Sequence, residues 1–313
     1  MNKKTAEFVS PKHPDKICDF IADSILDAYL AGDKNSRVAS EVMGGHGLVT
    51  INGEVTSLTK PDLEKVVKDI VGQDYKVIIN IVQQSPEIAQ GVDTGGAGDQ
   101  GIMKGYATSE TADGMPLEYT LARELCQKIF EVHPYDGKTQ VTVEDGKVKT
   151  VVASFQKTKN EDLLKLVQSI ISAEEYLINP AGEWNQGGFD ADTGLSGRKL
   201  IVDNYGPEHT IGGGSFSGKD HTKVDRSGAY MARKIALDLV KKYGAKEVET
   251  KLAYAIGKKD PVMAVAVIDG QEEEITGYDL SPKGIREFLK LDDVKFADTC
   301  TWGHFGRGFS WDK

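Results

Sequence analysis

Apolar residues recur at two spacings along the chain, and the order of these spacings repeats. Residues 15–32 have apolar residues at helical spacing, and Gly32 marks the expected end of a helix. After them come alternating residues, a second helical stretch, and a dense Ile- and Val-rich run that predicts a strand buried on both faces. The first unit is therefore predicted as helix, hairpin, helix and strand, at 15–32, 36–43 with 47–56, 60–73 and 75–84.

The same order occurs twice more, with a period of roughly 100 residues. In the second unit, an Asp145-Gly146 pair marks the hairpin turn. The second unit is predicted at 115–133, 138–156, 160–176 and 177–180, and the third at 224–244, 246–257 with 261–269, 281–291 and 294–302. The pattern predicts the α+β class, with three similar units, mainly antiparallel sheets, and domains at 1–93, 94–190 and 191–313.

The composition is that of an ordinary soluble protein, with 313 residues of which 39% are apolar. A net charge of −10 argues against a general binder of nucleic acid or anionic membranes. The sequence shows no apolar run of membrane-spanning length and no export signal. Cys18, Cys126 and Cys300 are too widely spaced to suggest a disulfide framework or a zinc site. We therefore expect a cytoplasmic protein in which any polyanionic ligand meets a local basic cluster.

Residues 212–227, GGGSFSGKDHTKVDRS, are similar to a P-loop except at Asp220, where that loop has Ser or Thr. A P-loop also lies directly between a strand and the helix that it caps. Here the nearest predicted strand, 198–203, is separated from Gly213 by an irregular stretch, and the next helix is predicted to begin with Asp225 as its N-cap. The context argues against a P-loop. It leaves a glycine-rich loop whose mixed charges suit a phosphate chain with Mg²⁺.

Three other stretches have the same mixture of glycine, acidic and basic residues. HPDK at 13–16 lies at the start of the first helix, where the helix dipole favours anions. The others are GGAGDQGIMKGYATSE at 95–110 and GLSGRKLIVD at 194–203. Taken alone, each is better explained as a helix cap, a linker or a solvated charged surface.

Taken together, these stretches resemble the S-adenosylmethionine synthetase (methionine adenosyltransferase) family over essentially the whole chain. The motifs that carry the resemblance are HPDK at 13–16, GAGDQG-M-GYAT-ET at 96–111, GL-GRK-IVD-YG at 194–206, GGG-FSGKD-TKVDRS-AY at 212–230, YAIG at 254–257 and GHFGR at 303–307. The resemblance implies three α+β units around a pseudo-threefold axis. It also implies a homodimer with active sites between subunits, with a tetramer as the alternative.

The resemblance further implies a reaction in which the sulfur of L-methionine attacks C5′ of ATP. The triphosphate leaves intact and is then hydrolysed to phosphate and diphosphate. A thioether has no proton to lose, so the site must chiefly align the substrates and stabilise the charge of the leaving group. The implied cofactors are Mg²⁺, about two per site, which act as Lewis acids, and K⁺.

The family's functional residues carry over to this chain one by one. The catalytic positions are His13, Lys138, Arg198, Lys199 and Lys219. The ATP-binding positions also include Asp99, Asp136, Trp184, Asp192 and Ser215. The methionine-binding positions are Glu54, Gln90, Asp192 and Lys223. The metal positions are Asp15 and Asp225 for Mg²⁺, and Glu41 for K⁺.

The chain also departs from the family pattern. The family's longer gating loop is reduced to Thr94 and Gly95 between QGVD and GAGDQG. We therefore expect an open site that retains methionine weakly. The remaining departures are Lys12 for the Gly before HPDK, Glu183-Trp184 for an Arg-Phe pair near adenine, and Thr210-Ile211 for an Arg-His pair before GGG. The Trp184 indole could still stack on the base, and His209 is a candidate replacement for the missing His.

Three alternative functions remain open at this point. The first is a degenerate homologue that binds ATP or S-adenosylmethionine without catalysis, which the complete set of phosphate-side residues argues against. The second is a tripolyphosphatase without transferase activity, which Glu54 and Gln90 argue against. The third is an unrelated Mg²⁺–nucleotide enzyme, which the context of the glycine-rich loop argues against.

Overall fold

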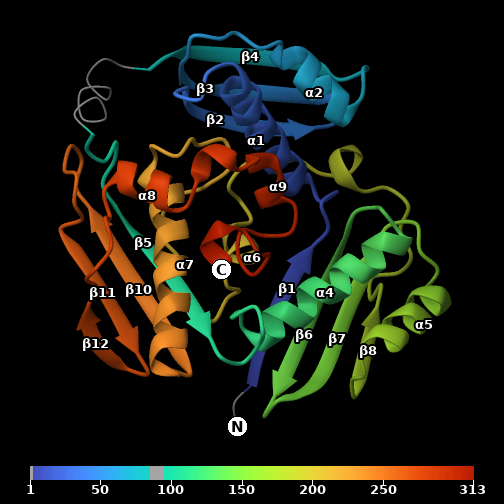
Figure 1. The fold of residues 1–313 in the computed structure, drawn as a ribbon. Coiled ribbons are helices and arrows are strands. Elements are labelled where there is room, and N and C mark those ends of the chain that lie inside the picture. The colour runs from blue at the N-terminus through green and yellow to red at the C-terminus, as the bar shows by residue number, and fades with distance from the viewer. Residues whose placement is uncertain (1–2, 85–94) are drawn as a thin grey trace.

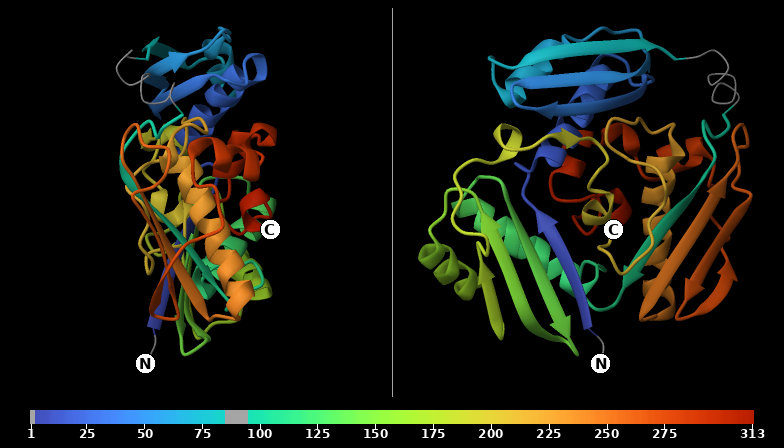
Figure 2. Two further views of the ribbon diagram at one scale, coloured as in Figure 1. Left: turned by 60° about the vertical axis from the view of Figure 1, so that its left-hand side comes forward. Right: turned by 180° about the vertical axis from the view of Figure 1, so that it is seen from behind.

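The computed structural model describes residues 3–84 and 95–313, and it contains three four-stranded sheets arranged around a common centre (Figure 1). The predicted α+β class with three similar units is confirmed. Helix α6 (Leu200–Asp203) and the C-terminal segment occupy the centre. In side view, the long helix α7 (Val224–Tyr243) lies on one side of its sheet, which leaves the other face without a helix (Figure 2).

The first sheet carries helices α1 and α2 on one face. Its strands run in the order β4 (Lys76–Gln83), β3 (Leu48–Thr56), β2 (Arg37–Gly45) and β9 (Gly194–Leu195). The helices are α1 (Pro14–Gly32) and α2 (Leu63–Val71). Pro14 suits the first turn of α1 because proline lacks a backbone N–H, and an N–H at this position would have no partner within the helix. Buried Val49 and Ile51 of β3 and Ile21 and Ile25 of α1 form the core between the two layers.

The other two sheets are built in the same way. The second runs in the order β1 (Lys3–Val9), β6 (Gly137–Glu144), β7 (Lys147–Phe155) and β8 (Glu175–Ile178), with helices α4 (Leu117–Val132) and α5 (Asn160–Ile170). The third runs in the order β12 (Gln271–Glu274), β11 (Met263–Ile268), β10 (Glu247–Tyr254) and β5 (Gly101–Thr108), with helices α7 and α8 (Pro282–Phe288). Asp145 and Gly146 both have positive φ, as the predicted hairpin turn requires.

Each sheet contains one strand from a different part of the chain. β1 precedes α1 but pairs with β6 in the second sheet. β5 precedes α4 but pairs with β10 in the third, and β9 precedes α7 but pairs with β2 in the first. The three units therefore exchange strands in a cycle. Because of this exchange, each sheet contains a strand from a neighbouring unit. The domain boundaries at 93 and 190 stay a prediction.

Residues 198–203 were predicted as a strand, and that prediction is wrong. The backbone N–H of Asp203 donates to the carbonyl of Lys199 and closes the single turn of α6. The Asp203 side chain then accepts from Nζ of Lys16 at 2.5 Å. Contacts with α1, rather than local strand propensity, decide the conformation of this segment.

Three other segments also differ from the prediction. The helix expected at 160–176 ends at Ile170, because the Tyr176 hydroxyl bonds to backbone groups of Ile171 and Ala173 in a turn before β8. The segment at 294–302, expected to supply the last strand, forms α9 (Phe296–Cys300). The N-cap of α7 is Lys223, and Asp225 lies inside its first turn. Short 3₁₀ helices complete the fold at Gly188–Asp190, Leu291–Asp293 and Ser310–Asp312.

β4 was predicted to be buried on both faces, but it is largely exposed. Among the described residues it pairs only with β3, and it forms an edge of the first sheet. Ile78 and Ile79 are each 42% exposed and Val82 is 52% exposed. Val77 and Ile81 pack against the core, whereas Ile78 and Val82 point to the opposite face of the sheet and remain exposed. An apolar face of this kind is typical of an interface with another protein.

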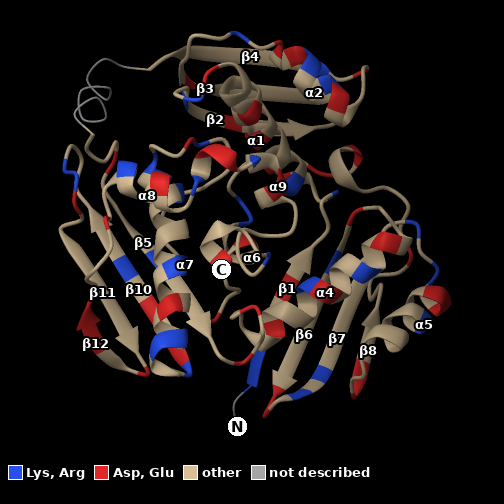
Figure 3. Cartoon of the chain, in the orientation of Figure 1, with Lys and Arg blue, Asp and Glu red and all other residues tan. Residues whose placement is uncertain are grey.

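Charged residues of both signs are mixed over the face shown in Figure 3. Within the described part of the chain, no helix combines the length and the apolar character that a membrane crossing requires.

Candidate active site

The first turn of α1 presents His13 and Asp15 to the loops that follow β9. His13 is the N-cap, and its Nδ1 accepts the backbone N–H of Asp15 at 3.1 Å. Burial, together with the nearby charges of Lys199 and Lys138, lowers the pKa of His13 to about 3. The ring is therefore neutral at physiological pH. Because Nδ1 accepts a hydrogen bond, the ring proton lies on Nε2.

Asp15 lies at the centre of a group of cations. Its Oδ2 accepts from Nζ of Lys199 at 2.6 Å, and its Oδ1 accepts the backbone N–H of Leu195 at 2.9 Å. Nε of Arg198 lies 3.4 Å from Oδ1. Burial opposes ionisation of Asp15, but the Lys199 and Leu195 hydrogen bonds hold the pKa of Asp15 below its usual value. The structure thus brings His13, Asp15, Arg198 and Lys199 together.

A second group lies on the glycine-rich loop at 212–223 and the first turn of α7. Nζ of Lys219 lies 3.0 Å from Oδ2 of Asp225. A Cβ at Gly214 would lie 2.1 Å from Oδ1 of Asp225, so only glycine lets the backbone approach this carboxylate. A Cβ at Gly101 would lie 3.9 Å from the same oxygen. The GAGDQG motif therefore ends beside Asp225.

The two groups lie on neighbouring loops. A Cβ at Gly197 would lie 2.6 Å from the Cβ of Ser215, which shows that the loop of Arg198 contacts the glycine-rich loop. Both loops also pair with the edge of β2 that faces away from β3. Ser196 exchanges hydrogen bonds with Val42, and Lys219 forms a β-bridge with Ala39. Ser215 is thereby placed between the two groups of cations.

The predicted residues of the nucleoside side lie around the start of β6. The carboxylate of Asp136 accepts the backbone N–H of Gly188 at 2.9 Å, and burial raises the pKa of Asp136. Lys138 is opposite Ser154 in the sheet, and Nε1 of Trp184 donates to the Ser154 hydroxyl at 3.0 Å. Asp192 is exposed, and its charge acts on the pKa of both His13 and Asp136.

The predicted methionine and potassium positions lie on and beside the first sheet. Glu54 of β3 is exposed and lies opposite Ala39, whose other neighbour is Lys219. Glu41 forms a short hydrogen bond with the Ser196 hydroxyl. Nζ of Lys223 lies 2.5 Å from the buried carboxylate of Asp220.

Some predicted residues are not joined to these groups. Asp99 is exposed, and its carboxylate accepts the backbone N–H of Gln100. Gln90 and the shortened loop at Thr94 lie outside the described residues. His209 stacks on the ring of Tyr106 at 3.6 Å, and burial lowers its pKa to about 4.

The carboxylates of the two groups suit Mg²⁺. Asp15 and Asp225 offer hard carboxylate oxygens, and Oδ1 of Asp225 faces the glycine backbone at Gly214. No group of three or more His, Cys, Asp or Glu side chains suited to a metal occurs in the described residues. Two carboxylates fit Mg²⁺, because this ion is usually bound by one or two carboxylates with substrate phosphates and water.

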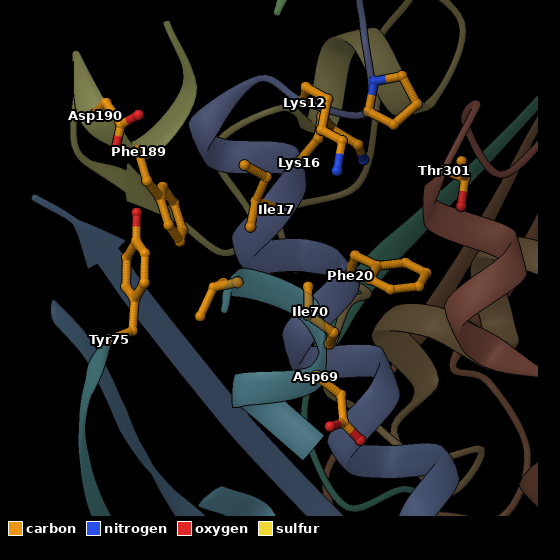
Figure 4. Close-up of a pocket in the computed structure, with 12 residues that line it drawn as sticks. Lys12, Lys16, Ile17, Phe20, Asp69, Ile70, Tyr75, Phe189, Asp190 and Thr301 are labelled. Carbon is orange, nitrogen blue, oxygen red and sulfur yellow. The ribbon is translucent and has the colours of Figure 1, made fainter. Parts of the chain in front are cut away.

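An apolar cavity of about 450 Å³ lies next to this site, behind α1 (Figure 4). Ile17, Phe20 and Ile70 line it, together with Lys12 and Lys16. None of the predicted site residues that the structure describes lines this cavity. A second cavity, of about 530 Å³, is lined by Arg198, Lys199, Ile201 and Ile211. Two of the predicted triphosphate cations, Arg198 and Lys199, thus line this cavity.

Sequence reasoning overlooked a set of buried aspartates on α1. Asp19 and Asp23 are 1% and 0% exposed, and each accepts a backbone N–H from one of the two cation-bearing loops. The signal was present in the sequence, because Asp15, Asp19, Asp23 and Asp27 are spaced by four residues on a helix whose other positions are largely apolar.

Comparison with known proteins finds similarity along the whole chain. Three family models match: the N-terminal, central and C-terminal domains of S-adenosylmethionine synthetase, at residues 2–86, 94–184 and 186–313. The S-adenosylmethionine synthase of Mycoplasmopsis pulmonis is 40% identical over 361 aligned positions, covering 100% of this chain and 96% of the relative. That of Borreliella afzelii is 39% identical, covering 99% and 94%.

A solved structure from Campylobacter jejuni, described as an unusual S-adenosylmethionine synthetase, has the same fold. Its TM-score is 0.89 at 34% identity, covering 100% of this chain and 97% of that one. The alignment with the Mycoplasmopsis pulmonis relative is longer than the 313 residues of this chain. That relative therefore carries segments that this chain lacks.

Proposed function

Because this chain belongs to the S-adenosylmethionine synthetase family, we propose that it makes S-adenosylmethionine from ATP and L-methionine and releases phosphate and diphosphate. The observation that carries the proposal is a pair of matched contacts. Lys199 and Lys219 lie on adjoining loops, and each contacts a carboxylate in the first turn of a helix, Asp15 of α1 and Asp225 of α7. Such a set suits a triphosphate with a divalent cation.

The proposed reaction needs stabilisation of the leaving group, and it needs no general base because a thioether has no proton to lose. As the C5′–O bond breaks, negative charge grows on the triphosphate, and fixed cations nearby lower the barrier. Lys199, Lys219, Arg198 and Lys138 supply that charge. His13 acts as a neutral donor, because its Nε2–H is left free by the bond from Asp15 to Nδ1.

The two ion pairs have a second role in the proposal. Each lysine is held by a carboxylate before the substrate binds, so neither ammonium is left unpaired in a partly buried site. Mg²⁺, when bound, would supply Lewis-acid charge to the triphosphate, with Asp15 and Asp225 as its protein ligands. Lys199 and Lys219 would then turn from carboxylate to phosphate.

The rest of the predicted site is proposed on the same basis. Asp99, Asp136, Trp184, Asp192 and Ser215 would bind the ATP. Glu54, Gln90, Asp192 and Lys223 would bind methionine, and Glu41 would bind K⁺. Because Cys18, Cys126 and Cys300 are buried free thiols, a reducing compartment suits the chain, and we propose the cytoplasm.

We also propose a homodimer in which the faces of the sheets opposite the helices meet. Val82 lies opposite Glu54 on that face of the first sheet, and Met43 lies opposite Leu195. Ile102, which is 52% exposed, occupies the corresponding face of the third sheet. Exposed apolar residues beside Glu54 would place methionine binding at the contact between subunits.

The test is incubation with ATP, L-methionine, Mg²⁺ and K⁺, followed by mass detection of S-adenosylmethionine. Formation of the product with phosphate and diphosphate supports the proposal. Binding of ATP without turnover would identify a non-catalytic homologue instead. Release of phosphate from tripolyphosphate without transfer to methionine would identify a tripolyphosphatase.

A further inference from the structure

α1 carries a row of four carboxylates, Asp15, Asp19, Asp23 and Asp27, at intervals of four residues. Residues at this spacing lie on one face of a helix, each roughly 6 Å further along its axis. Each of the four accepts at least one backbone N–H from a segment far away in the sequence. The four carboxylates therefore hold the backbone of distant segments against α1 by hydrogen bonds.

Two of these contacts come immediately before a predicted triphosphate cation. Oδ1 of Asp19 accepts the N–H of Gly197 at 2.8 Å, and the next residue is Arg198. Oδ1 of Asp23 accepts the N–H of Gly218 at 2.8 Å, and the next residue is Lys219. The two cation-bearing loops are thus attached to α1 in the same way, one helical turn apart.

The Asp23 contact is reinforced by Arg226. The guanidinium donates to both carboxylate oxygens of Asp23, at 2.6 and 2.9 Å. Nη1 also donates to the carbonyls of Phe216 at 3.0 Å and Lys219 at 3.1 Å. Arg226 and Asp23 are both 0% exposed, so this pair has no freedom to turn towards solvent. Together they bind three backbone groups of the loop at 216–219.

The other side of the same loop lies directly against β2. Gly218 has a φ of +80°, and a Cβ there would lie 2.1 Å from the carbonyl oxygen of Ser40. The N–H of Ser40 in turn donates to the carbonyl of Gly218 at 3.1 Å. The backbone that carries Lys219 is therefore fixed from both sides.

We propose that Asp19 and Asp23 are positioning residues that set the spacing between the loop of Arg198 and Lys199 and the loop of Lys219. This inference rests on the proposed triphosphate role of those cations. Asp19 acts through the amide of Gly197 and also accepts from Nζ of Lys16 at 3.1 Å. Asp23 acts through the amide of Gly218 and through the guanidinium of Arg226. The effect on rate is large because a displacement of about 1 Å in a positioned group can cost about 100-fold.

Asp27 provides a matched control on the same helix. Its two oxygens accept the N–H groups of Phe296 and Ala297, both at 2.9 Å. These residues begin α9, which carries none of the predicted site residues. Replacement of Asp27 removes the same kind of contact from the same row, but it leaves both cation-bearing loops attached.

The experiment compares Asp19→Asn, Asp23→Asn and Asp27→Asn, each assayed at a temperature where circular dichroism shows it fully folded. We expect kcat to fall about 100-fold in the first two variants, with the KM for methionine changed less than threefold. Affinity for inorganic tripolyphosphate with Mg²⁺, measured by calorimetry, falls in the same two variants. Asp27→Asn lowers the melting temperature but keeps kcat and tripolyphosphate affinity within threefold of the wild type.

A double variant shows whether Asp23 acts through Lys219. Asp23→Asn combined with Lys219→Met should be little slower than Lys219→Met alone, whereas two independent effects would multiply. If Asp23→Asn does not fold, Asp23→Glu keeps the charge and moves the carboxylate by one methylene, with Asp27→Glu as its control.

Equal kcat in the Asp23 and Asp27 variants, or multiplied effects in the double variant, would overturn the positioning role. Failure of the wild type to form S-adenosylmethionine would instead overturn the proposed function. The comparison of tripolyphosphate affinities would still test the positioning role in that case.

Discussion

Nζ of Lys219 lies 3.0 Å from Oδ2 of Asp225, and their side chains are only 19% and 12% exposed. Lys199 and Asp15 repeat this relationship at 2.6 Å on the neighbouring loop. In both pairs, a proposed phosphate ligand is held by a proposed metal ligand. The arrangement keeps both cations in place before the substrate arrives, and it predicts that metal and phosphate bind together.

Replacement of Lys219 tests the leaving-group role. Lys219→Met should lower kcat by about 100-fold or more, because it removes a fixed charge from the developing triphosphate. The melting temperature should change little, because the bridge between residue 219 and Ala39 uses backbone atoms. Lys65→Met is the control, because Lys65 pairs with Asp69 on the exposed face of α2. Near-normal turnover in Lys219→Met would exclude the assigned role.

Mg²⁺ affinity should depend on the phosphate chain. Since Lys199 and Lys219 occupy Asp15 and Asp225, Mg²⁺ alone should bind weakly, and tripolyphosphate should raise its affinity at least tenfold by drawing the lysines away. Calorimetric titration of Mg²⁺ with and without tripolyphosphate measures this coupling. Equal affinity in the two titrations would show that the carboxylates are not released by phosphate.

The neutral state of His13 should appear in the pH dependence of stability. The pKa of His13 is about 3 in the folded protein against 6.5 in the unfolded chain, so only the unfolded chain takes up this proton between those values. The His13 contribution to stability is therefore present above pH 6.5 and decreases as the pH falls towards 3. His13→Asn keeps a helix cap but removes the titration. Chemical unfolding from pH 7 to 4 should show a shallower loss of stability in this variant, and parallel curves would contradict the assigned protonation state.

The proposed subunit contact can be tested with two exposed valines. Val82, 52% exposed, lies beside Glu54 on the first sheet, and Val132, 58% exposed, ends α4 on the helical side. Val82→Lys should shift sedimentation towards the monomer and abolish activity, because a charge is placed at the centre of an apolar contact. Val132→Lys should leave both unchanged. A fully active monomer would exclude active sites shared between subunits.

The shortened link at Thr94 and Gly95 predicts a weakly closed methionine site. With little chain available to close over the substrate, we expect a raised KM for methionine and acceptance of ethionine at a comparable kcat/KM. Steady-state kinetics with both amino acids checks this. A low-micromolar KM with strong rejection of ethionine would show that another segment closes the pocket.

The three units could be predicted because their helices and hairpins are specified locally. The helix at 15–32 and the turn at Asp145-Gly146 have their own periodicity and turn residues, and both are present in the structure. β1 and β5 were missed because each pairs with a strand far along the chain, and β5 begins in a glycine-rich motif that reads as a loop. Such pairings leave little trace in the local pattern.

Errors arose where tertiary contacts decide the local structure. Leu200–Asp203 forms a helical turn rather than a strand, because Asp203 is held by Lys16 of α1. β4 has the composition of a buried strand, but its sequence could not show that it lies at a largely exposed edge of the sheet. The sequence motifs suggested the candidate site residues. The contacts of Asp19 and Asp23 with the backbone of two distant loops could be recognised only in the structure.

The most direct test of the proposed function follows the 5′ oxygen of ATP. In the proposed reaction the sulfur of methionine attacks C5′, so that the C5′–O bond breaks and the triphosphate leaves with that oxygen. With ATP labelled by ¹⁸O at the 5′ position, mass spectrometry should find the label in the product that carries the former α-phosphorus, either phosphate or diphosphate, and none in the nucleoside product. Label retained on adenosine would show cleavage at phosphorus, as in an ordinary nucleotide hydrolase, and would contradict the proposed function.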